Sequence, residues 1–146
     1  MAISSAICNT FKTEILTAVH NFTASSGNTF NLALYTSSAS MGAGTTAYAT
    51  TNEIANTSGS AYQPKGKALT SVTPVLDSST AVCDFANISW TSASFTANGC
   101  LIFNDTVAGD PAVCVIAFGG DKTVTSGTFT IEFPAAAAST AIVAIA

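Results

Sequence analysis

Apolar and polar residues alternate in short runs along most of this chain, and the densest part of the pattern lies between Phe95 and Phe133. Three apolar runs stand there, at Cys100–Phe103, Ala112–Phe118 and Thr128–Phe133, separated by gaps rich in Gly, Asp, Asn and Pro. Short β-branched and aromatic runs bounded by such residues are typical of consecutive antiparallel strands. The pattern therefore predicts a three-stranded meander, and we expect it to form the core.

Periodicity within these runs predicts which side chains are buried. The middle run is apolar on both faces from Val113 to Phe118, so it is expected to lie centrally. The last run alternates strictly, as a half-buried strand does. Its predicted buried residues are Phe129, Ile131 and Phe133, and its predicted exposed residues are Thr130 and Glu132.

The N-terminal segment has a different period. Ile3, Ile7, Phe11 and Ile15 recur at helical spacing, which predicts one amphipathic helix over Ser4–Asn21. These four residues are the candidate interface residues, because their apolar stripe is wide enough to pack on a partner. Alternatively, the helix covers a sheet face or an edge of its own domain.

The rest of the chain supplies further strands and loops. Strands are predicted at Phe30–Thr36, Ala68–Val75, Ala81–Phe85 and Thr140–Ile145, with the second and third forming a hairpin around the turn at residues 77–80. The Ser/Thr/Gly-rich stretch Ser37–Ser60 is predicted to be a long surface excursion.

About eight strands at fairly regular spacing favour a mainly β protein. The expected fold is an antiparallel β-sandwich or jelly-roll-like barrel with an N-terminal amphipathic helix. A chain of 146 residues fits one domain. Residues 1–22 would form the helix, as part of that domain or as an assembly arm, and residues 23–146 a single β domain.

Composition narrows the classes of partner. Charged residues make up only 8% of the chain, the net charge is −4, and all four basic residues are lysines. Nucleic acid and anionic membrane surfaces are not expected partners, because binding to either needs a basic patch. No apolar run reaches the roughly 18 residues needed to span a bilayer. An uncharged Ser/Thr/Ala surface suits a protein that lies against other subunits, and a neutral soluble domain is the alternative.

The four cysteines show neither Cys-x-x-Cys pairing nor metal-ligand spacing. The start of the chain lacks the features of a signal peptide, so free buried thiols in a reducing cytoplasm are expected. Cys100 and Cys114 are predicted to be small core residues in preference to a disulfide.

No catalytic apparatus is evident. The single histidine, His20, is predicted to be a solvated residue near the end of the helix, so no base is expected beside a Ser or Cys nucleophile. The candidate carboxylates for paired acid–base chemistry or calcium binding are Glu53, Asp84, Asp105, Asp110, Asp121 and Glu132. Three of them, Asp105, Asp110 and Asp121, lie in predicted turns, where local backbone bonding explains an aspartate. We therefore predict no catalytic, cofactor or metal site.

The aromatic residues leave two interpretations open. Trp90, the only tryptophan, is predicted to be a core residue, with a carbohydrate platform as the alternative. Tyr35, Tyr48 and Tyr62 are equally compatible with packing and with contacts to a ligand.

Several segments resemble a family of small virion structural proteins from tailed bacteriophages, including phages of marine and cyanobacterial hosts. The resemblance covers residues from about Phe30 to the C-terminus, and its segments are typical of a family's fold rather than of catalysis. The matching segments are Phe30-Asn-Leu-Ala-Leu-Tyr-Thr, Thr46-Ala-Tyr-Ala-Thr-Thr-Asn-Glu-Ile, Cys83-Asp-Phe-Ala-Asn-Ile-Ser-Trp, Ala97-Asn-Gly-Cys-Leu-Ile-Phe-Asn-Asp, Phe118-Gly-Gly-Asp-Lys and Gly127-Thr-Phe-Thr-Ile-Glu-Phe-Pro-Ala.

This resemblance implies a structural part of a phage particle, assembled in the host cytoplasm and located in the virion, and not an enzyme. The first expectation is a capsid decoration (cement) subunit that stabilises the particle through protein–protein contacts. The alternative is a neck, tail or fibre component that contacts host surface glycans. Expected partners are further copies of the chain, as a homo-oligomer and most simply a trimer, and the major capsid or other virion proteins.

Overall fold

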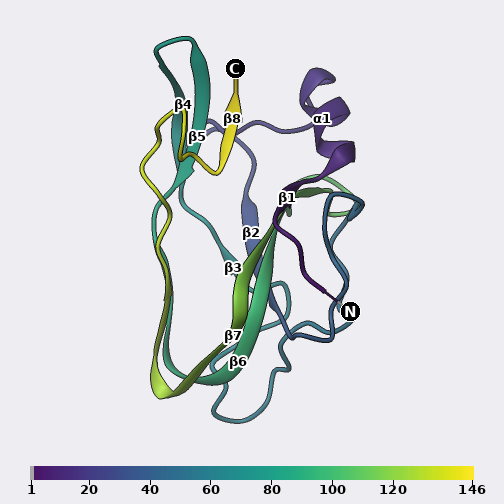
Figure 1. Cartoon of the computed structure of the whole chain (residues 1–146), viewed down its shortest axis with the longest axis vertical. Helices are drawn as coiled ribbons and strands as arrows, with labels where there is room; N and C mark the ends of the chain where they lie inside the picture. Colours follow the sequence, from purple (N-terminus) through teal and green to yellow (C-terminus); the bar gives the residue numbers. More distant parts are fainter. Residues whose placement is uncertain (1) are drawn as a thin grey trace.

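Two open antiparallel sheets make up most of the protein. The structure is a computed structural model and describes residues 2–146. The elements in these residues are β1 (Ala6–Ile7), α1 (Asn9–Leu16), β2 (Phe30–Tyr35), β3 (Lys67–Ala68), β4 (Ser71–Asp77), β5 (Thr80–Phe85), β6 (Ile88–Asn104), β7 (Ala112–Ile131) and β8 (Val143–Ile145), as Figure 1 shows. One sheet has the order β1-β7-β6-β2-β3 and the other β4-β5-β8. The prediction of a mainly β protein is confirmed, and two open sheets are consistent with a sandwich rather than a closed barrel.

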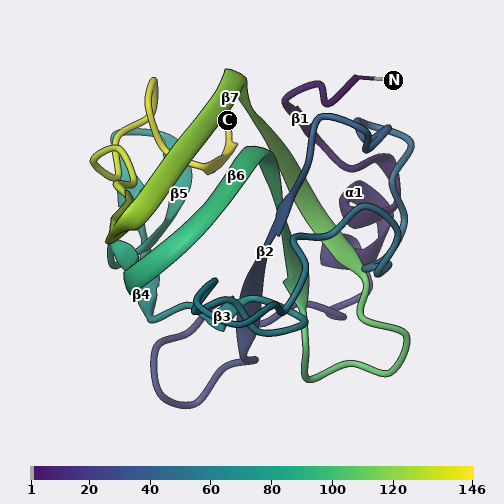
Figure 2. The ribbon, with the colours of Figure 1, turned by 90° about the horizontal axis from the view of Figure 1, so that it is seen from below.

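The long β6–β7 hairpin dominates this arrangement, and both of its strands bend sharply (Figure 2). At the bend the register shifts, so that Asn98 of β6 alone stands opposite residues 118–121 of β7. Within this bulge Gly119 and Gly120 have φ angles of +74° and +145°, which glycine adopts without steric cost.

The predicted three-stranded meander is therefore wrong. The second and third apolar runs belong to one strand, β7, because the glycines between them form a bulge and not a turn. After the bulge, pairing with β6 resumes at Lys122 and continues to Ile131.

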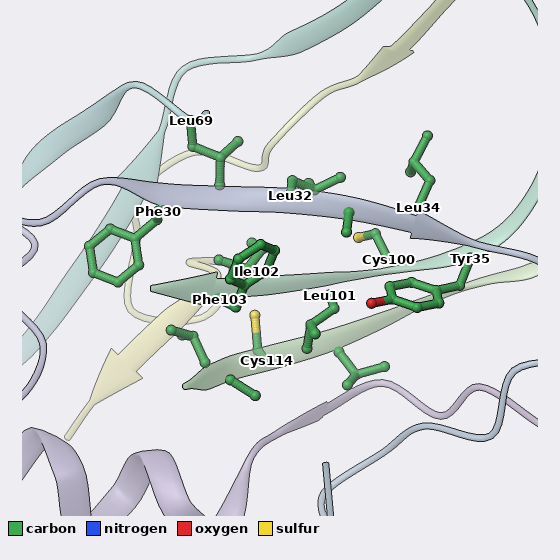
Figure 3. Close-up of a cluster of buried hydrophobic side chains, with 14 of the residues drawn as sticks. Phe30, Leu32, Leu34, Tyr35, Leu69, Cys100, Leu101, Ile102, Phe103 and Cys114 are labelled. Atoms are coloured by element: carbon green, nitrogen blue, oxygen red, sulfur yellow. The ribbon is translucent and has the colours of Figure 1, made fainter. Parts of the chain in front are cut away.

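The core lies around β2, which is flanked by β6 and β3. The strand predicted at Phe30–Thr36 is confirmed, and all six residues of β2 are buried. Figure 3 shows Leu32 above Ile102 and Leu34 above Cys100, in agreement with the register of β2 against β6. All four cysteines are free, as predicted.

The segment predicted as a surface excursion, Ser37–Ser60, contains no helix or strand and is largely exposed, but a few of its residues pack against β2 and β6. Ala39 and Ile54 are buried, and the Tyr48 ring stacks on Phe103 with centroids 4.8 Å apart. The Ile54 amide donates to the Leu34 carbonyl at 2.9 Å. The segment lacks an extended apolar pattern because single apolar residues, rather than a regular strand, make these contacts.

At the N-terminus the prediction of a helix over Ser4–Asn21 is wrong at both ends. Helix α1 spans only Asn9–Leu16, and Ala18 follows it at φ +60°, a conformation that no α-helix continues. The residues before it form β1, in which Ile7 pairs with Cys114 at the edge of β7. Edge pairing to β7 thus takes precedence over helix propensity in this segment.

The candidate interface residues lie largely within the protein's own core. Ile3 and Phe11 are buried, and Ile7 and Ile15 are half-buried against the same cluster. The apolar stripe therefore packs on its own domain, the alternative considered from the sequence. The large apolar residue of α1 that remains in water is Leu16, 86% exposed.

The strand predicted at Ala68–Val75 is divided between the two sheets. β3 pairs with β2 and β4 pairs with β5, while the buried Leu69 between them donates its amide to the Phe30 carbonyl at 2.7 Å. The predicted hairpin is confirmed, with Ser78 at φ +58° in its turn. The predicted C-terminal strand is confirmed in its second half, as β8.

Candidate functional site

The β4–β5 hairpin carries the most unusual surface of the protein. Six of the seven residues of β4 are exposed, yet several of them are apolar. Val72, Val75 and Leu76 are 44%, 56% and 71% exposed, and Ile145 of β8 is 53% exposed in the same small sheet. We call these four residues the hairpin surface. Figure 1 shows the hairpin projecting beyond the rest of the protein. The register places Leu76 and Ile145 on one face of the small sheet and Val72 and Val75 on the other. Exposed apolar side chains on a projecting element are typical of a contact site.

The outer edge of β4 is poorly suited to adding another strand. Pro74 lies in the middle of β4 and has no amide hydrogen, and the register with β5 shifts between Val72 and Val75. Proline and bulges are the common means by which proteins block edge-to-edge pairing. A partner would therefore contact the hairpin surface through side chains rather than through main-chain hydrogen bonds.

A second apolar surface is a groove with a volume of about 780 Å³ between the two arms of β7. The thiols of Cys100 and Cys114 lie among its lining, with β1 on one side. The larger apolar residues that line it are Ile7, Ile116, Phe118, Phe129, Ile131, Phe133 and Ile142. We call this feature the apolar groove.

The groove corrects the predicted burial of the last apolar run. The alternation is right, because Thr130 and Glu132 are exposed. However, Phe129, Ile131 and Phe133 are only half-buried. They are half-buried because they form walls of an open groove rather than part of a closed core.

One lysine on the groove has no side-chain partner. Lys122 is exposed on its lining, and no ion pair or side-chain hydrogen bond to it is present within residues 2–146. The other three lysines each bond a side chain or a carbonyl oxygen. Glu132 is the one carboxylate on the groove lining.

A buried polar network ties the long loop after β2 to that strand. Glu53 accepts hydrogen bonds from the Tyr48 hydroxyl at 2.6 Å, the Tyr62 hydroxyl at 2.7 Å and the Lys65 amide at 2.8 Å. The Tyr62 hydroxyl also accepts from the Leu34 amide at 2.9 Å. Burial, reinforced by Glu53, raises the pKa of Tyr48 to about 12 and that of Tyr62 still further. Neutral phenols that donate to one carboxylate hold this part of the fold together.

Two predicted turn aspartates have a partner that the sequence did not reveal. The Lys65 ammonium lies 2.7 Å from Asp105 and 2.9 Å from Asp110. Hydrogen bonds to Asp105 and Asp110 raise the pKa of the Lys65 ammonium above its ordinary value. This lysine forms ion pairs with two of the six carboxylates considered for calcium binding. The third, Asp121, lies in the bulge of β7 and accepts a hydrogen bond from Asn98 at 2.8 Å.

His20 is not solvated, so that prediction is wrong. It is 6% exposed, with its Nε2 2.7 Å from Glu14 and its Nδ1 3.1 Å from the Asn104 amide nitrogen. This arrangement fits a ring that donates from Nε2 and accepts at Nδ1. The left-handed Ala18 turns the chain back after α1, so His20 packs on Phe11 with ring centroids 5.0 Å apart.

Three of the four aromatic residues considered as possible ligand contacts are core residues, and Tyr48 is half-buried against Phe103. Trp90 is 2% exposed, as predicted for the core, and Tyr35 and Tyr62 are buried as well. Within residues 2–146 there is no group of three or more metal-ligating side chains. The same residues contain no helix that is long and apolar enough to cross a bilayer.

No family model, curated protein or solved structure matches this chain. The geometry offers two apolar surfaces suited to protein contacts, the hairpin surface and the apolar groove.

Proposed function

We propose that this protein is a structural subunit of a bacteriophage particle, acting as a capsid decoration (cement) protein through protein–protein contacts and not as an enzyme. The phage particle is what the resembling segments imply. The observation that carries the role in assembly is the exposed hairpin surface, in which Leu76 is 71% exposed on a projecting hairpin. The exposed parts of the valines and leucine of β4 contribute no apolar burial within the monomer. Burial in an assembly gives these residues a physical role.

The energetic gain from such a contact comes from apolar burial. Fully removing a valine or leucine side chain from water contributes about 1.5–3 kcal/mol. Val75 and Leu76 are more than half exposed, so a partner can bury most of each side chain. With only 8% charged residues in the chain, ion pairs can add little, and the association is expected to depend weakly on salt.

The alternative role, a neck, tail or fibre component that contacts host glycans, has less support. Sugar-binding surfaces commonly use an exposed aromatic face, and Trp90 and Tyr62 are buried in this protein. The segments that resemble phage virion proteins fit both positions in the particle. The exposed apolar hairpin favours a partner with an apolar protein surface over a hydrated glycan.

The test is to look for the protein in particles of the phage that encodes it, and to delete its gene. Mass spectrometry of purified particles is expected to find it in many copies, in a ratio to the major capsid protein set by capsid symmetry. Particles without it are expected to release their genome at a lower temperature and to regain heat resistance when purified protein is added back. Absence from the particles, or hydrolysis of capsular polysaccharide by the purified protein, would contradict the proposal.

A further inference from the structure

We infer that the apolar groove of one copy receives the hairpin surface of a second copy, so that the chain assembles head to tail. This inference deepens the proposed assembly role and rests on it. It names the partner of the hairpin as another copy of the same chain, and the groove as the receiving site.

The two surfaces are complementary in chemistry and separate in position. None of the four residues of the hairpin surface lines the groove, although Ile142, three positions before Ile145, does, so the two surfaces share no residue. One surface projects and the other is hollowed, and both are apolar. A protruding patch and a receiving pocket at different places on one molecule produce a heterologous contact, which closes into a ring or continues as a chain of subunits.

The size of the groove suits the side chains that would enter it. A volume of about 780 Å³ lies within the range of sites that accept ligands larger than one side chain. Its walls include Phe129 and Ile131, which are only half-buried and gain further burial from an occupant. Because Pro74 blocks strand addition along β4, side chains and not the strand edge are expected to enter the groove. Leu76, which shares its face of the sheet with Ile145, is the first of them.

Charge fixes the direction of docking. Asp77 follows Leu76 at the end of β4 and is exposed, and its Oδ2 accepts from the Ala138 amide at 2.7 Å. Lys122 is the lysine of the groove that has no partner within residues 2–146. Docking that sets Asp77 beside the Lys122 of the next copy pairs these charges and directs the acidic end of the hairpin away from Glu132.

The first experiment measures self-association by analytical ultracentrifugation of the full chain. Leu76→Asp is expected to weaken it by about tenfold to a hundredfold, the equivalent of one lost leucine burial. Leu16→Asp is the matched control, since Leu16 is more exposed but lies on α1, outside both surfaces. A wild-type chain that stays monomeric, or a control that weakens association as much as Leu76→Asp does, would overturn the inference.

The second experiment tests the head-to-tail geometry by mixing two variants. Leu76→Asp has a damaged hairpin and an intact groove, whereas Ile131→Asp has the reverse. Each is expected to be monomeric alone, and their mixture is expected to form a complex of one copy of each. Ile142→Asp, at a groove residue outside the strands, replaces Ile131→Asp if circular dichroism shows that variant to be unfolded. A mixture that stays monomeric would refute a hairpin-in-groove contact.

Charge reversal gives an independent measurement. Asp77→Lys and Lys122→Asp are each expected to weaken association by about twofold to fivefold, the range of an exposed ion pair, and the double variant to restore it. A double variant weaker than either single variant contradicts the proposed pairing. A hydrophobic small molecule or another virion protein can also be added to the wild-type chain and to Leu76→Asp. If it abolishes wild-type association and leaves Leu76→Asp unaffected, the groove is assigned to that occupant and not to a second copy. Self-association with no protein in the particle would refute the virion role and leave this contact standing.

Discussion

Replacing Tyr62 with phenylalanine removes a single oxygen from the centre of the buried polar network. The ring is retained, so its stacking on Trp90, with centroids 6.1 Å apart, is retained as well. Two hydrogen bonds are lost, because the hydroxyl donates to Glu53 and accepts from the Leu34 amide. The change therefore isolates the contribution of the hydroxyl from that of packing.

The expected loss of unfolding free energy depends on the group that each lost hydrogen bond leaves without its partner. The Leu34 amide lies in a fully buried strand and has no other partner for its hydrogen, so its orphaned donor costs about 1–3 kcal/mol. The bond to the Glu53 carboxylate is charge-assisted and contributes about 1.5–3 kcal/mol. Glu53 keeps Tyr48 and the Lys65 amide, so relaxation recovers part of this sum, and we expect a loss of about 2–5 kcal/mol.

Urea unfolding followed by the fluorescence of Trp90, the only tryptophan, measures this cost beside the ring that changes. Tyr48→Phe is the matched control. Its hydroxyl donates to the same carboxylate from a half-buried side chain, so its loss is expected to cost at most about 1.5–3 kcal/mol, without the additional cost of about 1–3 kcal/mol for an orphaned buried amide. Unfolding of Tyr62→Phe at the same urea concentration as Tyr48→Phe, with equal m-values, would refute the larger loss expected for Tyr62→Phe.

Two further predictions concern backbone strain and pH. Gly59→Ala is expected to lower the stability by about 1–2 kcal/mol, because Gly59 has a positive φ. Gly66→Ala is expected to lower it clearly more, because the added Cβ would also lie 1.8 Å from a carbonyl oxygen of β2. Equal melting temperatures for the two variants would contradict this. Stability is expected to fall as pH rises from about 8.5 towards 11, because an unfolded cysteine ionises near pH 8.5 whereas burial raises the pKa of Cys8 and of Cys83 to about 11. Denaturant unfolding at pH 7.5 and pH 10 checks the sign of this change in stability. A variant with alanine at both cysteines is expected to lose less stability between the two pH values.

Much of the sheet could be predicted from residue patterns, because strands with apolar runs are visible in the sequence. β2, β5 and the hairpin between β4 and β5 are examples. The course of β7 could not be predicted, since Gly-Gly-Asp is equally compatible with a turn and with a bulge. The difference depends on whether residues beyond the glycines pair with the same neighbour, which is a long-range property.

The prediction for the N-terminus was wrong for a related reason. Ile3, Ile7 and Phe11 have the spacing of a helix, yet the first two lie in extended segments that contact β7 or the long loop after β2. Three- or four-residue spacing over so few residues does not distinguish a helix from a strand followed by a short helix. The exposure of His20 was predicted wrongly because its burial depends on the turn at Ala18. Alanine is not a residue type that indicates such a turn.

The candidate surfaces were hidden from sequence reasoning for another cause. The apolar residues of β4 look like ordinary core residues until the structure shows that the strand lies outside the core. The groove depends on the bend of the β6–β7 hairpin, so it appears in no local pattern. Lys65 meets Asp105 and Asp110 across forty or more positions of the chain, a distance at which spacing carries no information.

The pairing of β2 has a consequence for how the protein is made. β2 ends at Tyr35, but its long partner in the sheet is the second half of β6, up to Asn104, and β1 pairs with β7 at Cys114 and Val115. During synthesis β1 and β2 therefore leave the ribosome well before the parts of β6 and β7 with which they pair. We expect the nascent chain to stay unfolded until β7 has emerged, so that a ribosome stalled before residue 112 presents a chain that proteases and chaperones can bind.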